Sequence, residues 1–121
     1  MVNIGVIGYG YWGPNIVRNF YGLSDCKIVA VCDKNSEALQ HAMATYSDIK
    51  CTHDAQDIFM SKAIDAVAIV TPVSTHYELA RQCLDNGKHV FVEKPFTATV
   101  PQAEELIQQA DKKHLTLMVD H

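Results

Sequence analysis

Residues 3–14 read NIGVIGYGYWGP, and this stretch carries the strongest structural signal in the chain. An apolar run leads into Gly8, Gly10 and Gly13, spaced as G-x-G-x-x-G, and Pro14 then stands at a favourable first position of a helix. Gly8 suits a tight turn, Gly10 lets the backbone approach a diphosphate, and Gly13 lets the helix pack closely. Free N–H groups at the helix start would then bind a dinucleotide. A structural turn without a ligand is the alternative interpretation.

Short apolar runs alternate with helix-period segments along the chain. Runs such as 66–70 are apolar at odd and even positions alike, which is typical of strands buried on both faces of a parallel sheet. Right-handed crossovers then give an α/β doubly wound parallel sheet, the Rossmann fold, with strand order 3-2-1-4-5-6. The predicted strands are Val2–Ile7, Lys27–Cys32, Ile64–Val70, His89–Val92 and Leu115–Val119, with a weaker one near Ile49–Thr52.

Capping residues indicate where the helices begin and end. The expected N-caps are Asn35, Asp54, Thr75 and Thr99, the last two in capping boxes with Glu78 and Gln102. Gly22 and Gly87 stand where helices are expected to end in the left-handed region.

The second predicted strand ends at Asp33, 25 residues after Gly8 (33 − 8). A carboxylate at this strand end can accept hydrogen bonds from the adenosine ribose. It would repel a 2′-phosphate, so NAD is favoured as the cofactor. Lys34 could pair with that phosphate and keeps NADP possible. The alternative for Asp33 is an ordinary turn residue at a strand end.

Ligands of open α/β sheets bind outside the carboxyl ends of the strands. Four polar or turn clusters follow predicted strands there: Gly8, Asp33, Thr71-Pro72 and Glu93-Lys94-Pro95. A lysine beside a bound nicotinamide could orient a substrate hydroxyl and help to move its proton. The bond to Pro95 is a candidate cis peptide, which would fix the direction of Lys94. The alternative is that Lys94 is a solvated loop residue.

Composition narrows the classes of function. The chain has 121 residues, the size of one domain, and 14 acidic against 10 basic residues give a net charge of −4. Lys and Arg are scattered, so nucleic acid is not expected as a partner. The four cysteines form no C-x-x-C pair, so we expect buried thiols in a reducing cytoplasm, without a metal site. Neither a signal peptide nor a membrane span is expected.

Three motifs together resemble the Gfo/Idh/MocA oxidoreductases. They are GVIGYGYWG at 5–13, VTPVSTH at 70–76 and EKP at 93–95, in the order and spacing of that family over essentially the whole chain. The resemblance implies NAD(P)-dependent hydride transfer to or from a sugar, inositol or related polyol. It also implies that Lys94 is the catalytic-site lysine and that Thr71, Pro72 and His76 line the nicotinamide half of the cofactor. A surface histidine in a first helical turn is the alternative for His76.

The cofactor contacts expected from motifs and resemblance form one set: Gly8, Tyr9, Gly10, Tyr11, Trp12, Gly13, Asp33, Lys34, Thr71, Pro72, His76, Glu93 and Lys94. No role is assigned to the histidines at 41, 53, 89 and 114. His121 is not expected to be catalytic.

Family members carry a second domain after the Rossmann domain, and that domain builds the substrate pocket. We expect residues 1–121 to be one NAD(P)-binding domain, with this substrate domain absent and turnover absent or very slow. A non-catalytic dinucleotide-binding, sensing or scaffold module remains an alternative, as does an interaction fragment without a ligand. An exposed apolar patch and uncovered sheet edges would favour self-association, so a homo-oligomer is a possible partner state.

Overall fold

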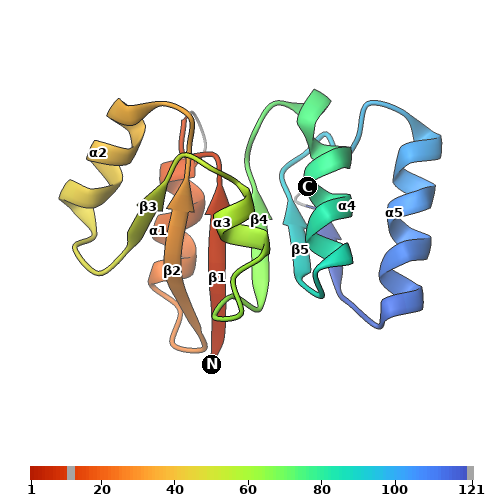
Figure 1. Cartoon of the computed structure of the whole chain (residues 1–121), viewed down its shortest axis with the longest axis horizontal. Coiled ribbons are helices and arrows are strands. Elements are labelled where there is room, and N and C mark those ends of the chain that lie inside the picture. Colours follow the sequence, from red (N-terminus) through yellow and green to blue (C-terminus); the bar gives the residue numbers. More distant parts are fainter. Residues whose placement is uncertain (11–12, 120–121) are drawn as a thin grey trace.

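The computed structural model describes residues 1–10 and 13–119, which form a six-stranded sheet with helices on both faces (Figure 1). Every strand pair is parallel and the order is β3-β2-β1-β4-β5-β6, so the predicted fold class and order are confirmed. The strands are β1 (Val2–Ile7), β2 (Cys26–Cys32), β3 (Lys50–Thr52), β4 (Ala66–Ile69), β5 (His89–Val92) and β6 (Leu117–Val119). The helices are α1 (Gly13–Tyr21), α2 (Ser36–Thr45), α3 (Gln56–Phe59), α4 (His76–Asp85) and α5 (Val100–Lys113), with a 3-10 turn η1 (Val73–Thr75) before α4.

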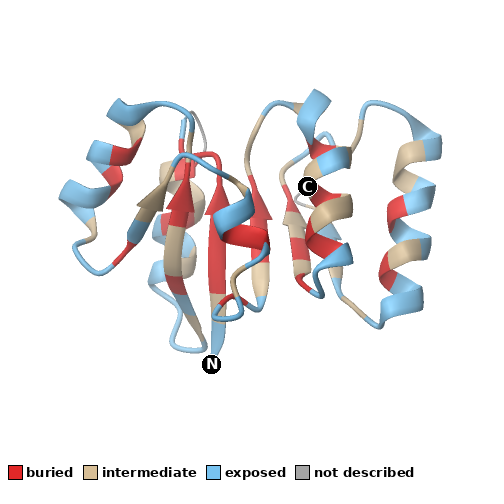
Figure 2. Cartoon of the chain, in the orientation of Figure 1, coloured by how far each residue is buried: buried red, intermediate tan, exposed pale blue. Residues whose placement is uncertain are grey.

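Each face of the sheet carries its own apolar core (Figure 2). On one face, Ile58 of α3, Leu84 of α4 and Leu106 of α5 are fully buried in a cluster with residues of β4 and β5. On the other face, Val17 of α1 and Leu39 of α2 pack with residues of β1 and β2. Burial of each such side chain stabilises the fold by about 1.5–3 kcal/mol. Helices on both faces therefore explain why the strands are apolar at consecutive positions.

Backbone hydrogen bonds just beyond the strand ends align the carboxyl ends of neighbouring strands. The N–H groups of Gly8, Asp33, Val70 and Glu93 each donate to the carbonyl of the last residue of a neighbouring strand, at 2.7 to 3.1 Å. Because all strands run in the same direction, these four positions meet at the carboxyl edge of the sheet. The fold therefore gathers the loops in which the sequence placed its site residues.

Two strands are shorter than predicted because the neighbouring turns use their first residues. Ile64 donates its N–H to the carbonyl of Ser61 at 3.3 Å, so β4 begins only at Ala66. Leu115 donates to the carbonyl of Ala110 at 2.9 Å and closes the end of α5 before β6 begins.

Three of the four predicted N-caps accept backbone N–H groups. Asn35 accepts from the residue two positions on at 2.8 Å and begins α2. Asp54 does the same at 2.9 Å just before α3, and Thr99 accepts from the residue three positions on at 3.4 Å and begins α5.

The predicted capping box of Thr75 with Glu78 is wrong. The Thr75 hydroxyl donates to the carbonyl of Pro72 at 2.6 Å inside the 3-10 turn, and Thr75 has a helical backbone. Glu78 pairs instead with Arg81 one turn further along α4, at 2.6 Å. The short turn takes the place of a conventional helix start, which a pattern of residue types does not reveal.

Of the two glycines predicted to be left-handed, Gly87 is, with φ 77°, and Gly22 is not. The N–H of Gly22 donates to the carbonyl of Arg18 at 3.2 Å, so the chain continues for one more right-handed step. His114 takes the left-handed position that ends α5, with φ 57°.

The four cysteines are free thiols, and Cys32 and Cys83 are buried. Burial raises the pKa of the Cys83 thiol to about 12 and that of Cys32 to about 11. Within the described part of the chain, no helix is long and apolar enough to span a bilayer.

We expect Cys32 and Cys83 to resist a thiol-specific disulfide reagent in the folded protein at about pH 8, because the thiolate is the nucleophile and burial disfavours it. The half-buried Cys26 and Cys51 should react first. Timed labelling followed by mass spectrometry measures this order, and denaturant should expose all four. Native labelling of Cys83 as fast as Cys26 would contradict the packing of α4 on the sheet.

Candidate dinucleotide-binding site

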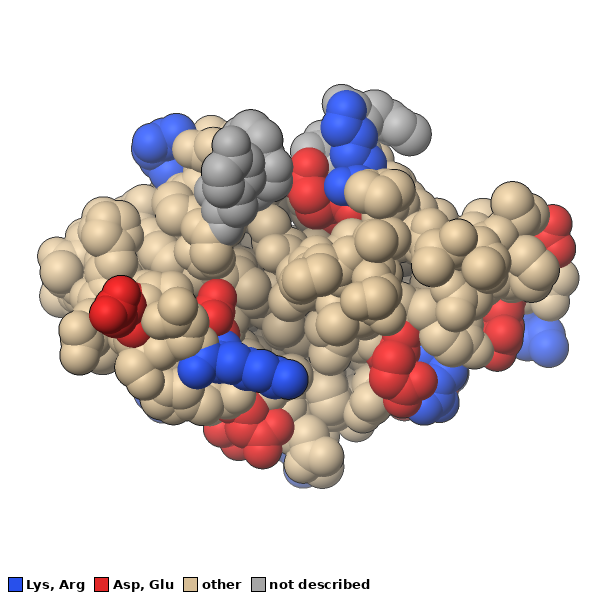
Figure 3. Space-filling view, turned by 90° about the horizontal axis from the view of Figure 1, so that it is seen from above, with Lys and Arg blue, Asp and Glu red and all other residues tan. Residues whose placement is uncertain are grey.

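A cavity of about 990 Å³ opens at the carboxyl edge of the sheet. Its walls come from the segments that follow β1, β2, β3, β4 and β5. Figure 3 looks onto this edge, where mostly uncharged surface lies between acidic and basic side chains. Small-molecule and cofactor sites enclose roughly 300–1,000 Å³, so the cavity has room for a dinucleotide.

The three glycines of the loop after β1 have different surroundings. Gly8 has φ 99°, and a Cβ there would lie 2.6 Å from the carbonyl oxygen of Val70. A Cβ on Gly13 would lie 2.7 Å from the carbonyl oxygen of Gly8. At Gly10, which lines the cavity, nothing lies within 4 Å of an added Cβ. The loop itself thus requires Gly8 and Gly13, whereas Gly10 leaves open the space in which a diphosphate would meet the main chain.

Asp33 ties the glycine loop to the end of β2. One carboxylate oxygen accepts the N–H of Tyr9 at 2.7 Å, and the other accepts the N–H of Asn35 at 2.8 Å. An ionised carboxylate has about four lone-pair sites, so both oxygens keep capacity for ribose hydroxyls. Asp33 therefore couples the loop suited to phosphates with the strand end suited to a ribose.

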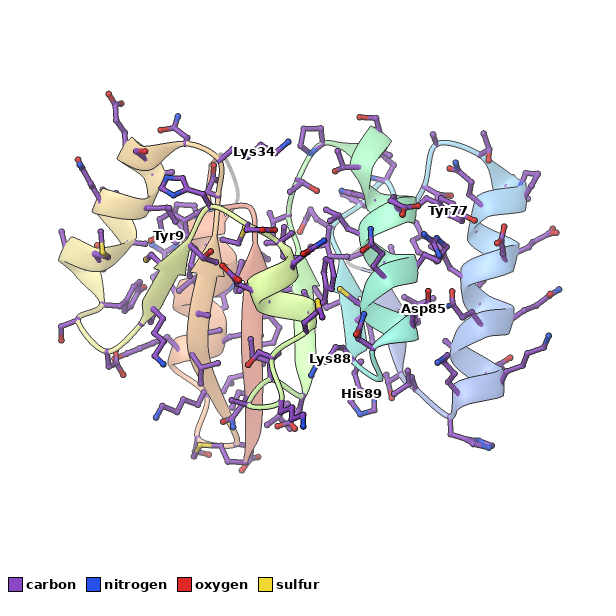
Figure 4. The ribbon with its side chains drawn as sticks, viewed as in Figure 1. Tyr9, Lys34, Tyr77, Asp85, Lys88 and His89 are labelled. Carbon is purple, nitrogen blue, oxygen red and sulfur yellow. The ribbon has the colours of Figure 1, made fainter. Side chains whose placement is uncertain are left out.

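Two basic side chains lie near Asp33 in the cavity wall. Lys34 lines the cavity, and Figure 4 shows it extending over the carboxyl edge of the sheet. His53 lines the same cavity from the end of β3, with its Nε2 3.0 Å from the hydroxyl of Ser36. No role was expected for His53, yet it directly follows β3. The carboxyl-end rule that selected Asp33 would have selected it too.

The opposite wall comes from the loops after β4 and β5. The peptide bond between Lys94 and Pro95 is cis, as the sequence allowed. His76 is 1% exposed, so the alternative of a surface histidine is wrong. Its ring bonds to backbone carbonyls in both of these loops. The other lining residues from the two loops include Thr71, Pro72, Glu93 and Lys94.

A family model described as "Oxidoreductase family, NAD-binding Rossmann fold" matches residues 2–121. The chain belongs to the Gfo/Idh/MocA family. It is 33% identical to UDP-N-acetylglucosamine 3-dehydrogenase of Acidithiobacillus ferrooxidans over 97% of this chain and 36% of that protein. It is 32% identical to the scyllo-inositol 2-dehydrogenase (NADP(+)) IolW of Bacillus subtilis over 99% of this chain and 33% of that protein.

Solved structures of oxidoreductases are also similar to this Gfo/Idh/MocA domain. Biliverdin reductase from Synechocystis, solved with biliverdin and NADP⁺, superposes with a TM-score of 0.94 at 27% identity, over 99% of this chain and 38% of that one. The chain thus spans about a third of the length of its relatives. Residues 2–121 therefore correspond to the NAD-binding Rossmann domain of these oxidoreductases.

Most of the cofactor residues predicted for the Gfo/Idh/MocA domain line one cavity: Gly8, Gly10, Asp33, Lys34, Thr71, Pro72, His76, Glu93 and Lys94. Gly13 begins α1 behind the loop. Tyr11 and Trp12 lie outside the described residues. Over residues 1–10 and 13–119, no three His, Cys, Asp or Glu side chains gather as metal ligands do.

The side chain of Tyr9 lies in the core and not in the cavity wall. It is 3% exposed, and its ring centroid lies 6.1 Å from that of His41 of α2 (Figure 4). Burial raises the pKa of its hydroxyl. Tyr9 therefore serves the loop through its backbone N–H, which Asp33 accepts.

Alanine at Gly8 and at Gly10 should separate folding from binding. Gly8→Ala should destabilise the fold by about 2–4 kcal/mol, since it combines left-handed strain with a backbone collision. Gly10→Ala should stay within about 1 kcal/mol of wild type but weaken NADH binding by about tenfold or more, because its methyl fills the open space. Chemical denaturation and NADH fluorescence measure the two effects. Equal loss of stability in both variants would contradict the loop geometry.

Proposed function

We propose that this NAD(P)-binding domain serves an oxidoreductase that transfers a hydride between the nicotinamide and a sugar, inositol or related polyol. The observation that carries the proposal is the placement of Lys94 in the wall of the same cavity that Gly8, Gly10 and Asp33 line. The names of two relatives, dehydrogenases of a UDP-sugar and of scyllo-inositol, support the substrate class. The alternative of a non-catalytic module has no comparable support.

Residues of this chain would bind and orient the cofactor, and Lys94 would transfer a proton. When bound, the cofactor supplies the hydride chemistry. Backbone N–H groups at the start of α1 would hold its diphosphate, and Asp33 its adenosine ribose. As an amine, Lys94 would take the proton of a substrate hydroxyl during oxidation, and as an ammonium it would return one during reduction. Residues that complete the substrate pocket would come from the part of a longer protein that corresponds to the rest of the relatives.

The adenosine end supports NAD as the cofactor and leaves NADP possible. The carboxylate of Asp33 suits a ribose diol and repels a 2′-phosphate, whereas Lys34 and His53 in the same wall can hydrogen-bond to that phosphate.

Four free thiols support a reducing compartment such as the cytoplasm. Met118 on the edge strand β6 is 58% exposed, which supports a further contact along that edge, with another domain or a second copy.

Lys34→Ala should weaken NADPH binding about three- to tenfold and leave NADH binding nearly unchanged, because it removes a cation that only the 2′-phosphate would contact. Fluorescence titrations with both reduced cofactors measure the two affinities. Lys62→Ala is the matched control, since Lys62 is exposed in the loop before β4, at the opposite edge of the sheet. An equal loss for both cofactors would argue against a 2′-phosphate contact by Lys34.

Hydride transfer is tested by incubating the protein with NAD⁺ and a panel of sugars, inositols and other polyols. The absorbance of the reduced nicotinamide measures the reaction. Turnover should require a protein that contains residues 1–121 together with a substrate-binding part. In such a protein Lys94→Ala should lower kcat by about 10²–10⁴-fold and leave NADH affinity within about threefold. Tight NADH binding without turnover of any substrate would favour the non-catalytic module instead.

A further inference from the structure

The structure buries one histidine in surroundings that constrain its charge. His76 begins α4 and is 1% exposed. Among the described residues the other buried polar side chain is Lys88, whose ammonium donates to the carbonyls of Ser61 and Ile64. Both side chains therefore meet backbone carbonyls. An ammonium has only donors, so contacts with carbonyls satisfy it. A neutral imidazole has one donor and one acceptor, so only one of its nitrogens can donate to a carbonyl.

Both ring nitrogens of His76 face acceptors. Nδ1 lies 2.9 Å from the carbonyl oxygen of Pro95 and 3.0 Å from that of Phe96. Nε2 lies 2.7 Å from the carbonyl oxygen of Thr71. A carbonyl oxygen accepts and never donates, so in either neutral tautomer one nitrogen lone pair would point at an oxygen at hydrogen-bonding distance. Only the doubly protonated ring gives both nitrogens a proton, with the Nδ1 proton shared between the carbonyls of Pro95 and Phe96.

The surroundings offset the cost of burying this charge. Burial disfavours the charged form of a histidine, whereas hydrogen bonds from that form to three carbonyl oxygens favour it. Glu78 of α4 and Glu93 after β5 line the same cavity and favour a cation, and Lys94 in that wall opposes it. From α5, which packs on α4, Glu105 hydrogen-bonds to Tyr77. Glu78 already pairs with Arg81, so the carbonyl oxygens at the two ring nitrogens are the groups that favour the charged form most directly.

We propose that His76 is an imidazolium that ties the loop after β4 to the loop after β5, and that it is thereby a positioning residue for Lys94. Its Nε2 holds Thr71, and its Nδ1 holds Pro95, the residue directly after Lys94. One charged ring thus fixes the backbone of both loops in the wall assigned to the nicotinamide. The positioning role rests on the proposed function of Lys94, but the charge of the ring does not depend on it.

Long-range ¹H–¹⁵N NMR of the labelled chain reads the charge directly. At about pH 7.5, both ring nitrogens of His76 should resonate in the protonated range. His89 is the internal reference, because its Nδ1 accepts the N–H of Thr116 at 3.0 Å and must carry a lone pair. It lies at the opposite edge of the sheet (Figure 4). One unprotonated nitrogen in His76 would overturn the proposal.

His76→Gln tests the link between the loops. A glutamine amide is neutral and can serve one of the two loops, so backbone amides at 73–75 and 96–98 should exchange hydrogen about tenfold faster or more. The matched control is His89→Gln, whose side-chain oxygen can still accept from Thr116 and should leave both loops unchanged. Identical exchange in the two variants would refute the link. If His76→Gln does not fold, the wild-type spectrum still decides the charge. A wild-type chain that fails to bind NADH would refute the proposed function alone.

Discussion

Gly8 donates its N–H to the carbonyl of Cys32 at 2.7 Å, and this bond fixes the place where the chain leaves β1. The position has φ 99° and stands so close to the carbonyl of Val70 that no side chain fits. Gly13, the first residue of α1, stands close against the carbonyl of Gly8. The point at which the chain leaves β1 therefore sets the direction of α1. It also sets the open space at Gly10 and the adjoining part of the cavity.

Two polar side chains then fix the loops on either side of that exit. Asp33 accepts the N–H of Tyr9, and the ring of His76 bonds to Thr71 and Pro95. The partners lie 24 residues apart for Asp33 and up to 19 apart for His76. Loops are ordinarily the more mobile parts of a fold. Loops held in place by such bonds before a ligand arrives reduce the ordering cost of binding.

The wall of the cavity carries both signs of charge, in a chain whose net charge is −4. Lys34, His53 and Lys94 all contribute to the wall of the cavity. Three acidic side chains, among them Asp33, line the same wall, so a diphosphate would rely on the backbone N–H groups at the start of α1 and not on an excess of positive charge. Total charge led to the expectation that nucleic acid is not a partner, but it carried no information about this local arrangement.

The sequence by itself determined the sheet and the position of the site. The spacing of Gly8, Gly10 and Gly13 after an apolar run sufficed for the loop, and runs apolar at every position sufficed for a parallel sheet with Asp33 and Lys94 at its carboxyl edge. These features are local, because they depend on residues close together in the chain. Tertiary structure alone decided the exceptions to the predicted lining and what the lining side chains bond to. It placed Tyr9 in the core, His53 in the wall and His76 between two loops, and it gave Thr75 to a 3-10 turn. These outcomes depend on contacts between loops that are far apart in the sequence, and the periodicity of the sequence does not predict such contacts.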